Sequence, residues 1–215
     1  MRLLHIDSSI TGGDSASRQV TGRIVGSIRE AHPGIEVIRR DLEAEPLPHL
    51  NSKMLAGLAP TISEDGAAAD AETRAELGRG FQALEEFLKA DIVVIGAPMY
   101  NFSISSQLKA WIDRIMVAGK TFAYTAEGPK GLAGGKRVII ASSRGGVYAR
   151  GSAQAVMDFQ ETYLGAIFRF IGVTDVTFIR AEGMAVSPEQ RATALTKALE
   201  TAALLPMSQA AAKAA

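Results

Sequence analysis

Cysteine is absent from the sequence. Disulfide bonds, thiolate nucleophiles, cysteine-ligated zinc and cysteine-held iron–sulfur clusters are therefore excluded. The three histidines do not predict a metal site either, because His5 lies in a predicted buried strand, His32 at a predicted helix end and His49 in a proline-containing loop, without metal-binding spacing. Any redox chemistry of this protein must therefore use a bound cofactor.

The sequence also lacks an excess of charge and a long hydrophobic run. Its 23 basic residues equal its 23 acidic residues, whereas nucleic-acid-binding proteins usually carry a basic surplus. No window approaches the roughly 20 apolar residues that cross a membrane, and the first apolar run is too short for a signal peptide. We expect a cytoplasmic protein that has neither nucleic acid nor membrane as a partner.

Three common site motifs are missing as well. Without GxxxxGK[ST], a nucleoside triphosphate held by a P-loop lysine is not expected, and without GxGxxG after the first strand a Rossmann dinucleotide site is not supported. The GxSxG turn that presents a catalytic serine is also absent.

Short β-branched runs alternate with longer segments of helical period along the chain. The predicted strands cover residues 3–7, 36–41, 92–95, 138–141 and 176–179. The predicted helices cover residues 17–32, 51–58, 70–89, 107–117 and 158–171, with a last helix opening at Ser187-Pro188. This alternation predicts a single α/β domain over residues 1–215, with a five-stranded parallel sheet between two layers of helices.

Three other segments have distinct patterns. Residues 121–135 are punctuated by glycine and predict a hairpin, and residues 59–69 predict a mobile loop inside the domain. The alanine-rich end from Ser208 is expected to fray.

The apolar face predicted for helix 70–89 consists of Leu77, Phe81, Leu84 and Leu88.

The loops after the first, third and fourth predicted strands have unusual composition, whereas the second strand ends in a plain Asp-Leu-Glu. Ligands of open α/β sheets bind beyond the carboxyl ends of the strands, where the strand order reverses. In the order 2-1-3-4-5 these three strands are neighbours. Their loops are therefore expected to converge on one site.

The first of these loops suits a phosphate group. It is rich in glycine and hydroxyls and opens a helix, so it offers backbone amides and the positive end of a helix dipole. Ser9, Ser15 and Ser17 add hydroxyl donors. The alternative is that Ser15 or Ser17 simply caps the helix.

The second loop suits a flat ring. Pro98 makes it rigid, Met99, Tyr100 and Phe102 supply apolar surface, and Asn101 offers a donor and an acceptor. The alternative for Phe102 is that it fills the core.

In the third loop, Gly145-Gly146 allows a close approach of backbone to a ligand edge, or forms an ordinary turn. Arg144 contacts the ligand or faces solvent.

These loops resemble a known family. The run Pro98-Met99-Tyr100-Asn101-Phe102, the run Ser143-Arg144-Gly145-Gly146 and the spacing Ser9…Ser15-Ala16-Ser17 are similar to the bacterial FMN-dependent NADH:quinone oxidoreductases, also called azoreductases. The resemblance extends over nearly the whole chain.

The resemblance implies a flavodoxin-like three-layer sandwich of strand order 2-1-3-4-5, as a homodimer with one non-covalent FMN per subunit. It implies that the Ser9 and Ser15–Ser17 positions hold the phosphate, Ala16 through its backbone only. Residues 98–102 would follow the ring and ribityl chain, and residues 143–146 would meet the polar edge of the ring. NADH or NADPH would donate the electrons in a ping-pong reaction that reduces quinones to hydroquinones and cleaves aromatic azo bonds to amines, without a catalytic side chain.

Candidate walls for the substrate are Phe122, Tyr124 and Tyr148. One subunit has too few loops to enclose ring and substrate together, so helices 107–117 and 158–171 are expected to contact a second subunit. Four aromatic residues support this expectation, namely Trp111, Tyr163, Phe168 and Phe170.

The alternative function is a non-enzymatic electron carrier that binds FMN and docks to protein partners. Such carriers are usually smaller and strongly acidic, whereas this chain is neutral.

Overall fold

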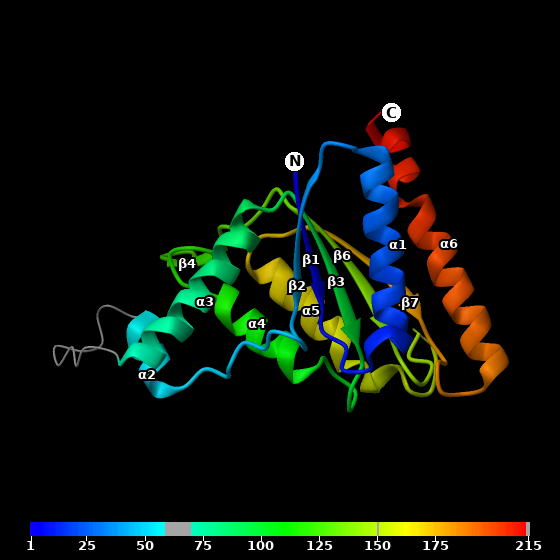
Figure 1. The fold of residues 1–215 in the computed structure, drawn as a ribbon, viewed down its shortest axis with the longest axis horizontal. Helices are drawn as coiled ribbons and strands as arrows, with labels where there is room; N and C mark the ends of the chain where they lie inside the picture. The colour runs from blue at the N-terminus through cyan, green and yellow to red at the C-terminus, as the bar shows by residue number, and fades with distance from the viewer. Residues whose placement is uncertain (59–69, 150, 214–215) are drawn as a thin grey trace.

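The computed structural model describes residues 1–58, 70–149 and 151–213. Five parallel strands form one sheet in the order β2-β1-β3-β6-β7 (Figure 1). They are β1 (Arg2–Asp7), β2 (Glu36–Asp41), β3 (Ile92–Pro98), β6 (Arg137–Ser143) and β7 (Asp175–Ala181). Counting only these strands along the chain, the order is the predicted 2-1-3-4-5, and the flavodoxin-like sheet is confirmed.

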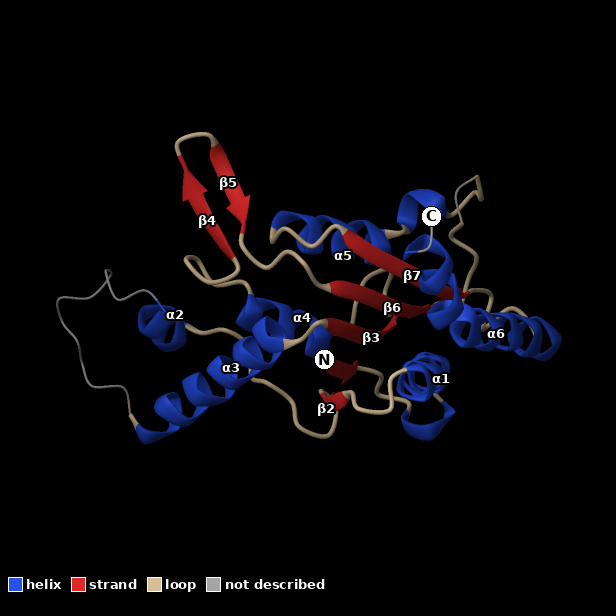
Figure 2. Ribbon diagram, turned by 90° about the horizontal axis from the view of Figure 1, so that it is seen from above, coloured by secondary structure: helices blue, strands red, loops and turns tan. Residues whose placement is uncertain are grey.

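Helices cover both faces of the sheet (Figure 2). On one face lie α1 (Ala16–Ala31) and α6 (Pro188–Lys213), and on the other lie α3 (Ala71–Lys89), α4 (Ser106–Ile115) and α5 (Phe159–Phe170). The short α2 (Ser52–Leu58) lies beside α3. The predicted three-layer arrangement is confirmed.

Each face of the sheet packs a separate apolar core. The central strand β3 contributes to both, because Val93 and Ile95 point to the layer of α3, α4 and α5 while Ile92 and Val94 point to the layer of α1 and α6. All seven residues of β3 are buried. The run of apolar residues without alternation is therefore explained by burial on both faces.

Three helices begin next to the residues at which the sequence predicted their start, and each of these residues caps its helix. The side chain of Asp70 accepts a hydrogen bond from the Thr73 amide at 2.7 Å, and that of Ser187 accepts one from the Gln190 amide at 3.1 Å. Asn51 caps α2 in the same way through the Met54 amide. These caps are local signals, which is why the sequence places them well.

The strands β3 and β6 extend further than predicted. Pro98 pairs with Ser143 at the end of the ladder, and the amide of Met99 donates to the Ser143 carbonyl oxygen at 2.7 Å. Residues expected in loops therefore hold the second and third loops side by side through backbone pairing.

The predicted apolar face of α3 is partly wrong. Phe81 is 46% exposed, and the buried face instead includes Gly80, Leu84 and Phe87. The reason lies in the neighbouring α4, whose Arg114 side chain lies against Gly80. A glycine carries no apolar signal in a periodicity analysis, although it allows the close approach here.

The predicted hairpin is confirmed as β4 (Phe122–Thr125) and β5 (Gly128–Gly131), and it projects from the body of the fold (Figure 2). The loop expected at residues 59–69 lies outside the described residues, and the fraying expected from Ser208 stays a prediction.

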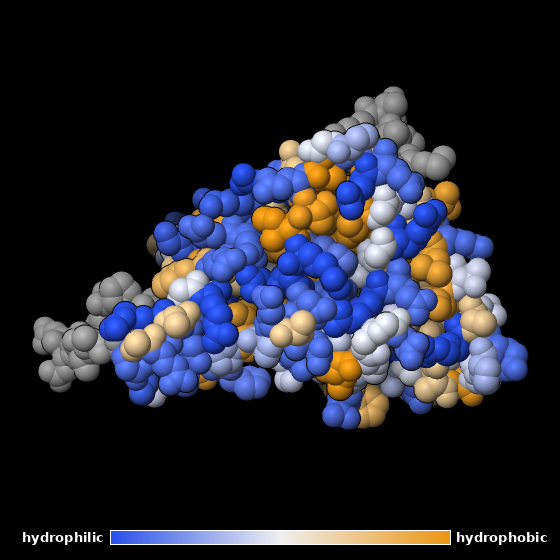
Figure 3. All heavy atoms as spheres, viewed as in Figure 1, coloured by the Kyte–Doolittle hydropathy of each residue, from blue (hydrophilic) through white to orange (hydrophobic). Residues whose placement is uncertain are grey.

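The molecular face in Figure 3 is mainly hydrophilic, with a compact apolar patch beside α1. Among the described residues, no helix is long and apolar enough to span a bilayer.

Candidate functional site

A cleft of about 310 Å³ lies at the carboxyl ends of β1, β3 and β6. Its walls come from all three predicted loops and from the start of α6. The lining residues are Ser9, Thr11, Asp14, Ser15, Ala16, Pro98, Met99, Tyr100, Ser143, Arg144, Gly145, Met184 and Arg191. The predicted convergence of the three loops is therefore observed.

Four of the predicted cofactor residues do not line this cleft, namely Ser17, Asn101, Phe102 and Gly146. Ser17 is buried, with its hydroxyl 3.1 Å from that of Ser15. Four further residues line the cleft that were not predicted from the sequence, namely Thr11, Asp14, Met184 and Arg191. The last two come from the chain after β7, which only the packing of the sheet brings here.

Ser15 has two roles in the first loop. It is the N-cap of α1, where its hydroxyl accepts a hydrogen bond from the Arg18 amide at 3.3 Å, and it also lines the cleft. The first amides of a helix have no intrahelical acceptor, so the start of α1 presents donors to the same space. The capping alternative for Ser15 is thus correct and compatible with ligand binding.

Tyr100 ties the second loop to the first. Its hydroxyl oxygen accepts a hydrogen bond from the Ile10 amide at 3.2 Å and lies 3.3 Å from the Ser9 hydroxyl. The ring therefore forms part of the cleft wall, and its hydroxyl orders the neighbouring loop.

Asn101 and Phe102 form a tight turn after Tyr100. The Tyr100 amide donates to the Ser103 carbonyl at 2.9 Å, and the Ser103 amide donates back at 3.1 Å. Both turn residues have positive φ, 47° at Asn101 and 70° at Phe102. Asparagine tolerates this region, but for phenylalanine it is strained. Phe102 is also 43% exposed and meets Tyr148 edge to face, so it does not fill the core.

The strain at Phe102 predicts an unusual result. The free energy of unfolding of Phe102→Gly should be about 1–2 kcal/mol higher than that of Phe102→Ala, because glycine adopts this φ freely and alanine does not. Both variants lose the ring, so urea unfolding of the two apoproteins isolates the backbone cost. Equal stabilities would show that this φ is not maintained in solution.

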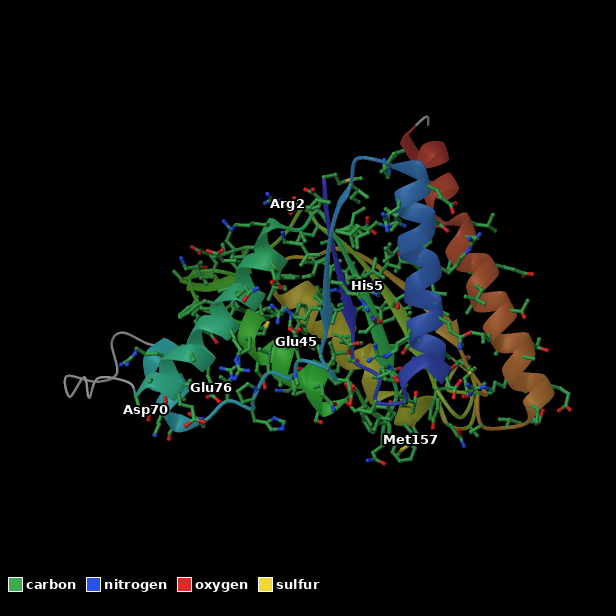
Figure 4. The ribbon with its side chains drawn as sticks, viewed as in Figure 1. Arg2, His5, Glu45, Asp70, Glu76 and Met157 are labelled. Carbon is green, nitrogen blue, oxygen red and sulfur yellow. The ribbon has the colours of Figure 1, made fainter. Side chains whose placement is uncertain are left out.

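A partly buried network of charged side chains holds the first loop in place. The guanidinium of Arg18 donates to Asp41 at 2.8 Å and to the Ser9 carbonyl oxygen at 2.8 Å. Asp7 lies within 3.6 Å of the same guanidinium, and His5, labelled in Figure 4, lies 3.3 Å from Asp7. The carboxyl end of β2 therefore contributes to the site, in contrast to what its sequence indicated. Asp41 binds the arginine that holds the Ser9 loop.

The contacts in this network also lower the pKa values of its two carboxyl groups, Asp41 and Asp7. The hydrogen bond from Arg18 is the main cause that lowers the pKa of Asp41 to about 2. For Asp7, burial opposes ionisation most strongly, but contacts with His5, Thr21 and Arg39 together outweigh it and lower the pKa.

Because the folded state lowers the pKa of Asp41, its contribution to stability is present above its ordinary value of 3.8 and is lost as the pH falls through about 2. We expect Asp41→Asn to lower the free energy of unfolding by about 1–2 kcal/mol at pH 7. The difference from the parent protein should shrink below pH 4. Chemical unfolding at several pH values measures it, with Glu43→Gln in the same exposed turn as control; a difference independent of pH would contradict the assignment.

Arg144 in the third loop is neither solvent-facing nor free. It is 2% exposed, and its guanidinium pairs with Asp158 at 2.9 Å, with Glu182 at 3.2 Å and also with Glu161. It further donates to the Ser142 hydroxyl at 3.0 Å. The solvent-facing alternative is therefore wrong, because this side chain joins β6, α5 and β7. Arg144 also lines the cleft, and its contact with the ligand stays a prediction.

The two glycines of the third loop differ. A Cβ at Gly146 would lie 2.7 Å from Oε1 of Gln154 and 3.2 Å from Tyr148, so a side chain there would displace the end of the Gln154 side chain. A Cβ at Gly145 would meet only Ala185, at 3.3 Å, and Gly145 lines the cleft.

A second, larger cavity of about 850 Å³ adjoins the cleft, and Met99 and Tyr100 form the shared wall. Its remaining lining residues are Ile10, Asn101, Ser103, Ile104, Ser106, Gln107, Lys109 and Tyr163. Asn101 thus faces this space and not the cleft.

The candidate substrate residues separate into two groups. Tyr148 lies beside Arg144, next to the cleft, in a pocket of about 410 Å³. Phe122 packs on Phe170 with ring centroids 5.0 Å apart, and Tyr124 is 76% exposed on the hairpin. The hairpin packs at Gly172, before the start of β7, so it lies at the end of the sheet opposite to the cleft.

The aromatic residues proposed for a subunit contact are largely explained within the chain. Trp111 and Phe168 are fully buried in the core, and Tyr163 and Phe170 pack against it partly exposed. Trp111 and Phe168 therefore do not support a subunit contact, whereas Tyr163 and Phe170 keep exposed surface, and the contact stays a prediction.

The cleft suits a ligand with an anionic end and a flat ring. Hydroxyls and helix amides gather at one end, and Met99 and Tyr100 supply the adjoining wall. The lining residues include no cysteine or histidine nucleophile.

Comparison with known proteins agrees with this geometry. The chain matches the Flavodoxin_2 family, described as a flavodoxin-like fold, over residues 1–205. It is 57% identical to an FMN-dependent NADH:quinone oxidoreductase of Methylocella silvestris over 92% of this chain and 95% of that protein. A Bradyrhizobium diazoefficiens protein of the same name is 54% identical over 95% of this chain and 98% of its own length.

Solved structures give the same result. An azoreductase of Bacillus anthracis superposes with a TM-score of 0.86 at 31% identity, over 96% of this chain and 98% of that one. An FMN-dependent NADH-azoreductase from the same species, determined in complex with FMN, superposes with a TM-score of 0.83 at 28% identity, over 96% of this chain and 100% of that one. On these matches the chain belongs to the flavodoxin-like Flavodoxin_2 family and, within it, to the FMN-dependent NADH:quinone oxidoreductases.

Proposed function

We propose that this protein is an FMN-dependent oxidoreductase that transfers electrons from NADH or NADPH to quinones and aromatic azo compounds. The observation that carries the proposal is the convergence of the loops after β1, β3 and β6 on one cleft. Relatives above 50% identity that bear this activity in their names support it.

The donor set of the cleft fits one non-covalent FMN. Its phosphate is assigned to the first loop, where the hydroxyls of Ser9 and Ser15 lie next to the start of α1. Its ring is assigned to the wall of Met99 and Tyr100, with the backbone at Gly145 along the polar edge. Ser17 takes part through its backbone amide, since its side chain is buried against Ser15.

When bound, FMN supplies the hydride and electron transfer, which explains why no nucleophilic side chain is needed. The chain contributes position and order. Tyr100 holds the Ser9 loop through the Ile10 amide, and Arg18 holds the same loop through the Ser9 carbonyl. A preorganised site of this kind binds its cofactor without the cost of ordering loops.

Donor and acceptor are proposed to use the same space in turn. The cavity beside Met99 and Tyr100 is the candidate space, and Asn101 and Tyr163 face it. The hairpin with Phe122 and Tyr124 lies at the far end of its own sheet, so these residues can reach a cleft only on a second subunit. We therefore propose a homodimer in which each subunit helps to close the other's substrate space.

Ping-pong turnover by a dimer is the expected result. Double-reciprocal plots of NADH oxidation at several concentrations of a small quinone should give parallel lines, because the nicotinamide must leave before the quinone binds. Light scattering at the assay concentration should give twice the 22.7 kDa chain mass.

Other outcomes contradict separate parts of the proposal. Intersecting lines would indicate that donor and acceptor bind together. A fully active monomer would exclude the shared substrate space. Absence of turnover with NADH and quinone, in a protein that retains FMN, would instead favour the electron-carrier alternative. The cytoplasmic location stays a prediction.

A further inference from the structure

Arg144 and Arg191 line the cleft, and Arg18 holds the Ser9 loop beside it. Two of these three arginines are neutralised by carboxylates. Arg18 is paired with Asp41 and lies near Asp7. Arg144 is paired with three carboxylates. Neither guanidinium has charge left to balance an anionic ligand.

The third arginine, Arg191, is different. It lies in the first turn of α6, where its amide donates to the Ser187 carbonyl oxygen at 2.9 Å. Its guanidinium donates to the backbone carbonyl oxygen of Asp14 at 3.0 Å. Within the described parts of the chain, it forms no ion pair with a carboxylate, and its side chain is exposed.

The fold brings this free charge to the phosphate end of the cleft. Helices α1 and α6 run side by side, and both begin at the end of the molecule where the strands finish (Figure 1). Arg191 therefore shares the cleft wall with Asp14, Ser15 and Ala16, and it does not line the larger cavity assigned to donor and acceptor.

We propose that Arg191 binds the phosphate of FMN and supplies the full positive charge that the loop after β1 lacks. The inference rests on the proposed placement of the cofactor. A guanidinium can donate two parallel hydrogen bonds to phosphate oxygens, which hydroxyls and amides complement without neutralising the charge. Its present bond to Asp14 holds it at the cleft edge.

The test compares FMN with riboflavin, which has the same ring and no phosphate. Arg191→Met keeps an aliphatic side chain and removes the charge. We expect FMN to bind the apoprotein about 10- to 100-fold more weakly, measured by quenching of flavin fluorescence, with riboflavin affinity unchanged. The salt dependence of FMN binding should also decrease, because one cation fewer contacts the phosphate.

Lys197→Met is the matched control, since Lys197 is an exposed cation on the same helix that lines neither the cleft nor the larger cavity. It should leave both affinities at the parent values. An unchanged ratio of FMN to riboflavin affinity in Arg191→Met would overturn the proposal. So would normal FMN binding combined with a raised KM for NADH or NADPH, because the arginine would then serve the dinucleotide.

Failure of this inference can be distinguished from failure of the proposed function. If FMN binds elsewhere, an acidic substitution at Ala16 will also leave FMN affinity unchanged. If only the role of Arg191 is wrong, that substitution will abolish FMN binding while Arg191→Met will not.

Discussion

An Ala16→Asp variant should lose its FMN and keep its fold. Ala16 is the first residue of α1 and lines the cleft. Ala16 is buried, so the new carboxylate is partly desolvated, and its favourable interaction with the helix dipole, about 0.3–1 kcal/mol, offsets part of that cost. Two like charges about 4 Å apart repel by about 4 kcal/mol at an effective dielectric constant near 20. FMN affinity should therefore fall by at least about 100-fold.

Ala16→Asn is the matched control, because it adds a side chain of the same size without charge. FMN titration should distinguish the two variants, while riboflavin titration should not. Urea unfolding of both apoproteins checks the fold. If the aspartate variant binds FMN as tightly as the asparagine variant, the phosphate does not lie at the start of α1.

The second large effect is expected at Arg144, on stability and not on affinity. Arg144→Met would leave the carboxylates of Asp158, Glu161 and Glu182 together without their shared cation. Removing one partner of a buried ion pair costs about 3–5 kcal/mol, because the remaining charge is desolvated and unpaired. Urea unfolding of the apoprotein should show a loss of this size.

Arg180→Met is the control for this variant. Arg180 pairs with Glu161 as well, but 48% of its side chain is exposed, so its removal should cost about 1 kcal/mol or less. A second substitution, Glu182→Gln in the Arg144→Met background, should recover part of the loss by removing one unpaired charge. Equal effects of the two arginine variants would show that the cluster is solvated.

The elements that the sequence predicted well depend on local chemistry. The caps at Asp70 and Ser187 and the turn of the hairpin are set by residues a few positions apart. The buried run of β3 is equally local. The face of α3 was predicted less well, because Gly80 has no side chain and its position is decided by Arg114 of another helix.

The functional site likewise combines features that the sequence predicted with features that only packing decides. The sequence indicated the loops at Ser9–Ser17, Pro98–Phe102 and Ser143–Gly146 because each combines unusual composition with the end of a strand. It did not indicate that Ser17 and Gly146 lie outside the cleft wall, since the position of a residue relative to a cleft depends on what packs around it.

The sequence by itself determined the order of strands and helices, the loops that carry the site and, through the resemblance of those loops, the family. Only the tertiary structure decided which arginine is free to bind an anion. Arg18, Arg144 and Arg191 are chemically identical, but carboxylates brought from distant strands and helices neutralise the first two. A charge interacts with whatever lies within a few ångströms of it, and those neighbours are set by the packed fold and not by the adjacent residues of the chain.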